Sequence, residues 1–475
     1  MSRTPRAKLR NILITVALGS FMGQIDNSIV NVSLPVIQKD FNISLALTEW
    51  VVTAYLITIS STLLLCGKLA DAFGWKRIFV TGLSIFTVGS LICGLSVNIA
   101  ILLFGVSVQA VGGAMIISSG PAISTHAADE KDRGKALSVT AVSISLALCL
   151  GPLLGGILTA TLGWHSIFFV NVPVGVIAIF LAVRNIEKDE PHTNTLFDWK
   201  GGVLFILSLW LILFPLDTIG ESYMPAGLFV GLLFAGVLLW FLFALYERKQ
   251  PNPLLRFSLF RSRIFVYNGI AAMLNFTAMY IFIFLLPFYL ETFRHFSTVQ
   301  AGLLYLPMPL AFLLAAPASG SLSDRIGSRG LCITGMGVMG VALLLMSFLG
   351  QNTGLPYLIL VVALIGIGYG MFQTPNNSAV LGSVPDADRG VTSGTLSTMK
   401  NIGMILGITA SGSLFTVLQT LGKQNATAQK LSVQAIQNQS FTFALHITFL
   451  IAMVIALLAM VACIPAKARG IVGKQ

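Results

Sequence analysis

The chain has 475 residues, of which 55% are hydrophobic and only 10% are charged, with a mean hydropathy of +0.86. A soluble protein carries about 25% charged residues, so this chain could not cover a soluble surface with polar groups. The composition therefore excludes a soluble enzyme or receptor domain and predicts an all-α integral membrane protein.

About fourteen segments are long and apolar enough to cross a hydrocarbon core of about 30 Å as helices. Backbone groups in lipid must bond within their own segment, and the short alternating segments of a transmembrane barrel do not occur. In chain order the predicted spans are 11–33, 47–69, 78–97, 99–121, 136–160, 166–184, 201–218, 226–246, 265–290, 299–322, 331–350, 355–377, 391–418 and 442–464.

Basic residues are unevenly distributed between the segments that connect these spans. With the N-terminus in the cytoplasm, 24 of the 29 lysines and arginines fall on the cytoplasmic side. Lys39, Arg294, Lys423 and Lys430 fall on the opposite side, and Lys400 lies inside a span. This bias predicts a multi-pass protein of the inner (plasma) membrane with both termini in the cytoplasm. It also accounts for the net charge of +11, so we expect no nucleic-acid partner.

Two sequence patterns occur twice. The segments 67–77 and 320–329 share the pattern G-x-L-x-D-x-x-G-x-(K/R), and the Asp-Arg-Gly before span five at 132–134 returns at 388–390. The offsets are 253 and 256 residues, which indicates an internal duplication. Parallel repeats of this kind, with a binding site near the midplane, are typical of secondary transporters.

The repeats predict three segments. Residues 1–190 would form one six-helix bundle, 191–264 two linking transmembrane helices and a cytoplasmic connector, and 265–475 the second six-helix bundle.

Four segments together resemble a known family. Residues 67–77 match a cytoplasmic hallmark motif, 25–35 are close to L-D-x-T-I-V-N-V-A-L-P, 151–156 read G-P-x-x-G-G, and 164–175 are similar to the start of helix six. The chain resembles the major facilitator superfamily, specifically its fourteen-helix drug:proton antiporter branch. The resemblance covers nearly the whole chain and implies a major facilitator fold that works by alternating access.

The motif segments supply the candidate gating residues. Glycines permit tight turns and close helix approach, Pro152 bends its helix, and Asp71 can cap a helix or pair with a basic residue. The alternatives are a solvated turn for 67–77 and ordinary small-residue packing for 151–156. The candidates are Gly67, Asp71, Gly74, Lys76, Arg77, Arg133, Gly151, Pro152, Gly155, Gly156, Asp324, Arg325 and Arg389.

Asp26 is a carboxyl group midway along the first span. Charge inside a membrane is costly, so such a group normally faces a cavity or a partner. Gaining a proton removes that cost and changes which conformation is preferred, which is the physical basis of proton coupling. The alternative is a structural carboxyl tied to Asn27, Asn31 or a neighbouring helix. In the resembled family this position is a candidate protonation site.

Lys400 is the only basic residue predicted deep inside a span. It can pair with an acid across a cavity or bind an anionic substrate group, or it can snorkel toward the cytoplasm. It follows Arg389 by eleven residues, about 16 Å at helical rise, which is far for snorkelling.

Other polar residues in the spans are open between cavity lining and helix packing. Glu49, at the start of span two, is expected at the membrane interface, and Trp50 is either an interface residue or a cavity wall. The remaining candidates are Gln109, Asn275, Gln373, Asn376, Asn377 and Tyr55.

One position departs from the resembled family. That family carries an arginine, linked to proton coupling, three residues before the glutamine of its fourth-helix Q-G-x-G stretch. Here the stretch is 109–112 and the aligned residue is Val106, which cannot form an ion pair.

The sequence therefore predicts a monomeric proton-coupled exporter (an antiporter) of small amphiphilic or drug-like compounds, with protons, substrate and membrane lipids as its partners. The alternative is an exporter of a specific metabolite, siderophore or lipid with atypical or no proton coupling. No phosphate-binding loop, Cys/His cluster or nucleophile–base pair occurs, so no enzyme activity, metal or cofactor is predicted.

Overall fold

The computed structural model describes residues 6–128, 133–187, 198–217, 224–250, 253–384, 389–428 and 432–465. These residues are almost entirely helical, and fourteen of the helical segments they form are long and apolar enough to cross a membrane. The prediction of an all-α membrane protein with about fourteen spans is confirmed.

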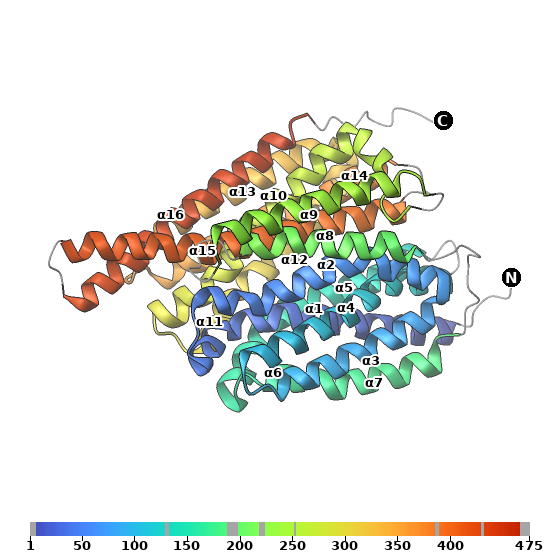
Figure 1. Ribbon diagram of the computed structural model, residues 1–475, viewed down its shortest axis with the longest axis horizontal. Helices are drawn as coiled ribbons and strands as arrows, with labels where there is room; N and C mark the ends of the chain where they lie inside the picture. The colour runs from blue at the N-terminus through green and yellow to red at the C-terminus, as the bar shows by residue number, and fades with distance from the viewer. Residues whose placement is uncertain are drawn as a thin grey trace. The chain divides into compact units, whose positions relative to one another are not determined.

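The helices of the first half are coloured blue to green in Figure 1. They are α1 (Arg6–Phe41), α2 (Leu45–Phe73), α3 (Trp75–Gly94), α4 (Ile99–Ala127), α5 (Arg133–Leu162), α6 (Ser166–Phe169), α7 (Asn171–Asn185), α8 (Trp199–Asp217) and α9 (Ala226–Glu247).

The helices of the second half are coloured yellow-green to red in Figure 1. They are the 3-10 helix η1 (Phe257–Arg261), α10 (Arg263–Pro287), the π-helix η2 (Phe288–Phe293), α11 (Thr298–Tyr305), α12 (Pro307–Ile326), α13 (Ser328–Met346), α14 (Leu355–Gly382), α15 (Arg389–Ala428) and α16 (Val433–Ala462).

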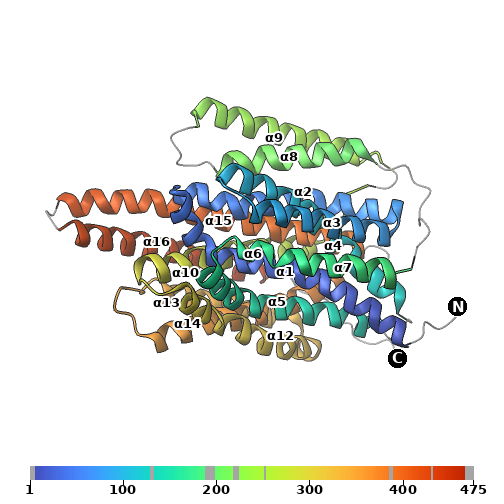
Figure 2. The ribbon, with the colours of Figure 1, turned by 90° about the horizontal axis from the view of Figure 1, so that it is seen from below.

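The chain folds into two compact units. One contains 1–213, 230–254 and 297–303, and the other contains 214–229, 255–296 and 304–475. Most of α8 and α9 therefore groups with the first unit, as does most of α11. In Figure 2, α8 and α9 lie side by side. The glycine at 236 allows this close contact, because a Cβ at that position would lie 2.8 Å from the backbone of Leu211.

Both units pack their helices in the same pattern. In the first, α1 packs on α5, α2 on α4, and α3 on both α4 and α7. In the second, α10 packs on α15, α12 on α14, and α13 on both α14 and α16. Helices at equivalent places in the two halves of the chain therefore make equivalent contacts, in agreement with the repeated sequence motifs.

The repeated motif produces the same turn in both units. Gly74 ends α2 and precedes α3 with φ at 96°, and Gly327 ends α12 and precedes α13 with φ at 85°. Each glycine N–H donates to the carbonyl four residues earlier, at 3.0 Å for Gly74 and 2.9 Å for Gly327. A residue with a side chain rarely adopts a backbone conformation with positive φ. This explains why the motif carries glycine at the turn.

Several helices continue well past the predicted spans. The first predicted span ends at residue 33, whereas α1 runs through Pro35 to Phe41. The thirteenth was predicted over 391–418, whereas α15 has 40 residues, about 60 Å at helical rise. Hydropathy detects only the apolar part of a helix, so it does not find the polar extensions at the helix ends. In Figure 1 the far ends of α15 and α16 extend beyond α10 and α14.

Candidate functional site

The side chain of Asp26 is enclosed within the first unit and only 3% exposed. Its Oδ1 accepts a hydrogen bond from Gln109 Nε2 of α4 at 2.9 Å and another from Asn171 Nδ2 of α7 at 2.7 Å. Gln109 and Asn171 are themselves buried, at 0% and 2% exposure. Two neutral amides therefore hold the carboxyl group, and the part of the chain that the structure describes gives it no ion pair.

Close packing of α3 against α4 positions Gln109. A Cβ at Gly89 would lie 2.5 Å from the backbone nitrogen of Gln109, so only glycine allows this approach. Ser90, next along α3, receives a second hydrogen bond from Gln109 Nε2 at 2.8 Å. Gln109 Oε1 has no hydrogen-bond partner among the described residues, which leaves one buried acceptor facing no donor.

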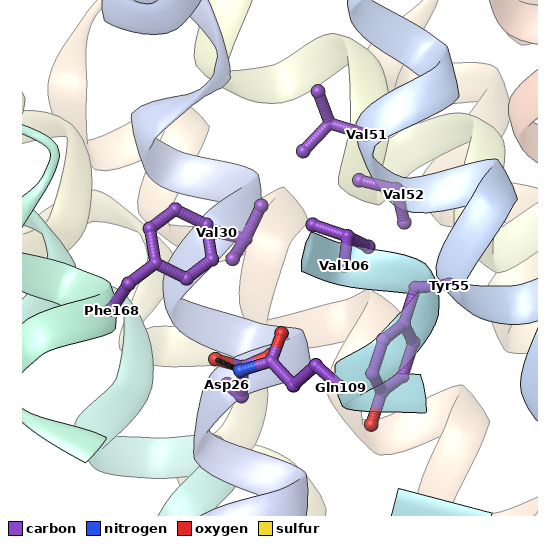
Figure 3. Close-up of a pocket in the computed structure, with 8 residues that line it drawn as sticks. All are labelled: Asp26, Val30, Val51, Val52, Tyr55, Val106, Gln109 and Phe168. Atoms are coloured by element: carbon purple, nitrogen blue, oxygen red, sulfur yellow. Dashed lines mark hydrogen bonds between the residues drawn. The ribbon is translucent and has the colours of Figure 1, made fainter. Parts of the chain in front are cut away.

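A pocket lies directly beside this carboxyl group. Its cavity volume is about 10 Å³, which is room for about one water molecule. Figure 3 shows the Gln109 amide against Asp26, with apolar side chains from α1, α2, α4 and α6 around the remaining space. The lining residues are Asp26, Val30, Val51, Val52, Tyr55, Val106, Gln109 and Phe168.

An apolar pocket with one carboxyl group suits proton exchange rather than bond chemistry. The carboxyl group can carry or release a proton, and its amide partners can adapt to either form by donating to the oxygen that stays unprotonated. No group of histidines, cysteines or acids that could hold a metal occurs among the described residues. Val106, the position where the resembled family carries arginine, is 3% exposed and lines the pocket, so no fixed positive charge lies at that point.

The structure brings only some of the first-half candidates to this pocket. Tyr55 and Gln109 line it, whereas Asn31 and Trp50 are buried, at 3% and 8% exposure, without lining it. The side chain of Asn27 lies outside the described residues. Assignment of these residues to a transport site stays a prediction.

The position of Glu49 differs from the prediction made from the sequence. It was expected at the membrane interface, but it is 0% exposed, and nearly every residue of α2 from Thr48 to Cys66 is also buried. The interfacial placement is wrong, because neighbouring protein rather than lipid headgroups covers the start of α2.

The second-half candidates divide between two places in the second unit. Lys400 Nζ donates to Asn377 Oδ1 at 2.8 Å and lies 5.9 Å from the centroid of the Phe276 ring. Gln373 and Asn376 lie on α14 within one turn of Asn377. Asn275 lies elsewhere, between α10 and α13, where its Nδ2 contacts the sulfurs of Met336 and Met339 at 3.1 and 3.3 Å.

The cytoplasmic motif makes local contacts within the first unit. Asp71 is exposed and accepts from Trp75 Nε1 at 3.1 Å, and no ion pair joins it to Arg77 among the described residues. Lys76 donates to the carbonyl oxygens of Val183, at 2.8 Å, and Ile186, at the end of α7. Lys76 therefore caps the carbonyl end of another helix in its own unit.

The remaining charged residues among the gating candidates lie at helix ends. Asp324 and Arg325 are exposed at the end of α12, and the side chains of Arg133 and Arg389 lie outside the described residues.

An ion pair joins Lys8 of α1 to Glu187, just after the end of α7. The Lys8 ammonium holds the pKa of the Glu187 carboxyl group below its ordinary value.

The segment 151–156 contacts two other helices through its glycines. On one side a Cβ at Gly151 would lie 2.5 Å from Ser28 Cβ of α1, and one at Gly155 would lie 2.8 Å from the Ile29 carbonyl oxygen. On the other side a Cβ at Gly156 would lie 2.5 Å from the carbonyl oxygen of Thr298 in α11.

The approach of α5 to α11 is reciprocal. A Cβ at Gly302 of α11 would lie 2.4 Å from the carbonyl oxygen of Pro152. Backbone therefore meets backbone from both helices, and any larger side chain at either glycine would force them apart.

Sequence reasoning missed three residues around Asp26: Asn171, Ser90 and Phe168. Asn171 and Phe168 lie inside the segment 164–175 that carried the family resemblance, so the motif itself was the available signal. Ser90 had none, because only the packing of α3 on α4 brings it to Gln109.

Comparison with known proteins identifies the family. The profile of the Major Facilitator Superfamily matches residues 16–408, most of the chain. The chain belongs to the major facilitator superfamily. Family and fold are those of membrane transporters, and the predicted family is confirmed.

Characterised members of the superfamily show what the chain is similar to. The riboflavin transporter RibZ of Clostridioides difficile (strain 630) is 33% identical over 440 residues, which cover 92% of this chain and 95% of that protein. Multidrug resistance protein 3 of Bacillus subtilis (strain 168) is 26% identical over 412 residues, which cover 86% of this chain and 80% of that protein.

Solved structures of the superfamily share the fold. A bacterial homologue of the human lysosomal transporter Spinster, in an inward-facing and unoccupied conformation, aligns with a TM-score of 0.70 at 15% identity. The alignment covers 98% of this chain and 100% of that one.

Proposed function

We propose that this transporter exports small amphiphilic or drug-like compounds in exchange for protons, by alternating access. The observation that carries the proposal is the buried carboxyl group of Asp26, held by Gln109 and Asn171 beside an apolar pocket. A proton added to this group removes a charge that burial penalises. The protonated and ionised proteins then prefer different conformations, which links proton movement to substrate movement.

The relatives support export of drug-like compounds. Several similar proteins are named multidrug resistance proteins, including one from Bacillus subtilis. The pocket beside Asp26, at about 10 Å³, holds about one water molecule, so it supports the proton-exchange part of the proposal rather than substrate binding.

The orientation belongs to the same proposal. We place both termini in the cytoplasm and the protein in the plasma membrane, because 24 of 29 basic residues then lie on the cytoplasmic side. Protons moving inward would then drive substrate outward.

The test is transport by the purified protein in proteoliposomes with an imposed pH gradient. Wild type is expected to accumulate a cationic dye such as ethidium, and Asp26→Asn to lose at least about tenfold of the gradient-driven rate. Asp40→Asn is the matched control, since Asp40 lies on the same helix and its Oδ2 accepts from Trp164 Nε1 at 2.8 Å. Gradient-driven transport that survives in Asp26→Asn would contradict the proposal.

A second candidate is transport of a specific metabolite with weak or no proton coupling. Two observations favour it: the 33% identical relative named a riboflavin transporter, and an apolar Val106 beside Asp26. Riboflavin uptake in the same proteoliposomes separates the two. Riboflavin transport that ignores both the pH gradient and Asp26→Asn, with no dye transport, would favour this candidate over the first.

A further inference from the structure

Three helices of the second unit converge at Lys400. The residue lies on α15, donates to Asn377 on α14, and has its ammonium 5.9 Å from the Phe276 ring on α10. Since both neighbours belong to the same unit, Lys400 points toward α10 and α14 within that unit.

The charge of Lys400 is incompletely satisfied. An ammonium group has three donors, and one of them is used by Asn377. The structure records no acid within ion-pair distance of Lys400 among the described residues, and no further acceptor for it. A half-buried charge without a counter-charge is costly, and a ligand that brings an acceptor or a negative charge would offset that cost.

Polar and aromatic side chains continue from Lys400 along α14. Tyr369, Gln373 and Asn377 are spaced four residues apart, so they form one stripe on the helix. Gln373 Oε1 has no hydrogen-bond partner among the described residues. Asn376, beside the stripe, is 0% exposed, and neither of its polar atoms is hydrogen-bonded within the described ranges. Unpaired buried amides are uncommon and indicate a missing partner.

Aromatic rings line the same region. The Phe276 ring meets the Tyr369 ring edge-on, with centroids 5.7 Å apart, and Tyr369 stacks on Phe312 at 4.9 Å. Phe276 is also 6.4 Å from Tyr280, one turn along α10. The region around the stripe therefore combines packed aromatic rings, amide side chains and one cation.

We propose that Lys400, Asn377 and Gln373, with the rings of Phe276 and Tyr369, form a binding site in the second unit for a planar aromatic anion. The rings provide apolar contacts, the amides provide hydrogen bonds, and Lys400 selects negative charge. The inference goes beyond the proposed function and does not rest on it, because it concerns binding by the second unit alone.

The test is calorimetric titration of the full-length protein in lipid nanodiscs with two probes that share a ring system, 2-naphthoate and 2-naphthamide. Wild type should bind the anion at least about tenfold more tightly than the neutral amide, which corresponds to about 1.4 kcal/mol. Lys400→Met, which keeps the length of the side chain, should abolish this preference and change 2-naphthamide affinity by less than about threefold. Tyr369→Leu should weaken binding of both probes.

Control variants separate the site from general effects of charge and folding. Lys423→Met removes another lysine of the same helix, at its exposed end, and should keep the preference for the anion. Lys400→Arg should retain most of it, and an unchanged unfolding midpoint shows that each variant is folded. Equal affinity for the two probes in wild type, no binding of either, or a preference that survives Lys400→Met would overturn the inference.

The outcome is independent of the proton-coupling test. If 2-naphthoate binds through Lys400 but no pH gradient drives transport, the proposed function fails and this site stands. If dye transport depends on the gradient and Asp26 but the anion preference is absent, the site fails and the proposed function stands.

Discussion

At the scale of single residues, the structure shows two polar centres of opposite character, one in each unit. Asp26 Oδ1 accepts hydrogen bonds from two neutral amides, whereas Lys400 uses one of its three donors. Both residues stood out in the sequence because charge is rare inside spans. Of their partners, only Gln109 and Asn377 were among the candidates from the sequence. An amide in a span is as often a packing residue as a site residue, so amides alone do not mark a site.

The bond from Asn171 to Asp26 has a measurable energetic consequence. Asn171→Leu removes a 2.7 Å hydrogen bond to a buried carboxyl group and should lower the free energy of unfolding by about 1–3 kcal/mol. In an Asp26→Leu background the same substitution should cost much less, because the acceptor is already gone. Denaturant unfolding in detergent measures both differences.

Asn185→Leu is the matched control for that cycle. Asn185 also lies on α7 and also donates to α1, through Thr15 Oγ1 at 3.1 Å, but far along the helix from Asp26. Its cost should be the same in both backgrounds. An equal cost for Asn171→Leu with and without Asp26 would show that Asn171 acts through packing alone.

At the scale of helices, glycine determines which backbones can meet. The contact between α5 and α11 depends on Gly156 and Gly302, each placed against a carbonyl oxygen of the other helix. The sequence identified the motif at 151–156 but not its partner, since no motif at 297–303 connects this segment with α5.

A single methyl group tests that contact. Gly156→Ala would place a Cβ 2.5 Å from the Thr298 carbonyl oxygen, so the two helices must separate. We expect a loss of about 1–3 kcal/mol in the free energy of unfolding, together with slower transport. Thermal unfolding and the proteoliposome assay measure the two effects.

Gly231→Ala in α9 is the comparison for that variant, because a Cβ there meets nothing within 4 Å. Alanine at an open helical position should be neutral or stabilising, by up to about 1 kcal/mol. If Gly156→Ala behaves like Gly231→Ala, the close approach of α5 to α11 has no energetic importance.

At the scale of the whole molecule, the charge bias gives a direct prediction of orientation. Lys39, at the end of α1, and Arg325, at the end of α12, are both exposed and are predicted on opposite sides of the membrane. Lys39→Cys should react with a membrane-impermeant maleimide in intact cells, and Arg325→Cys only after permeabilisation. The five native cysteines are all buried, so wild type should give little background labelling. The reverse labelling pattern would invert the proposed orientation and the direction of export.

The sequence by itself determined the class of protein, its fourteen spans, its internal repeat and its family. Each follows from local properties: apolar runs, basic loops and motifs that are contiguous in the chain. It also marked Asp26 and Lys400, because a charge in an apolar run needs no tertiary information to be recognised.

Only the tertiary structure decided what surrounds those charges. Asp26 meets residues 83 and 145 positions away, and Lys400 lies beside a helix that begins more than a hundred residues earlier. Such contacts depend on which helix faces pack together, and apolar helix surfaces are too alike in sequence to specify this. For the same reason Glu49 was misplaced, since hydropathy does not distinguish burial in protein from exposure to the membrane interface.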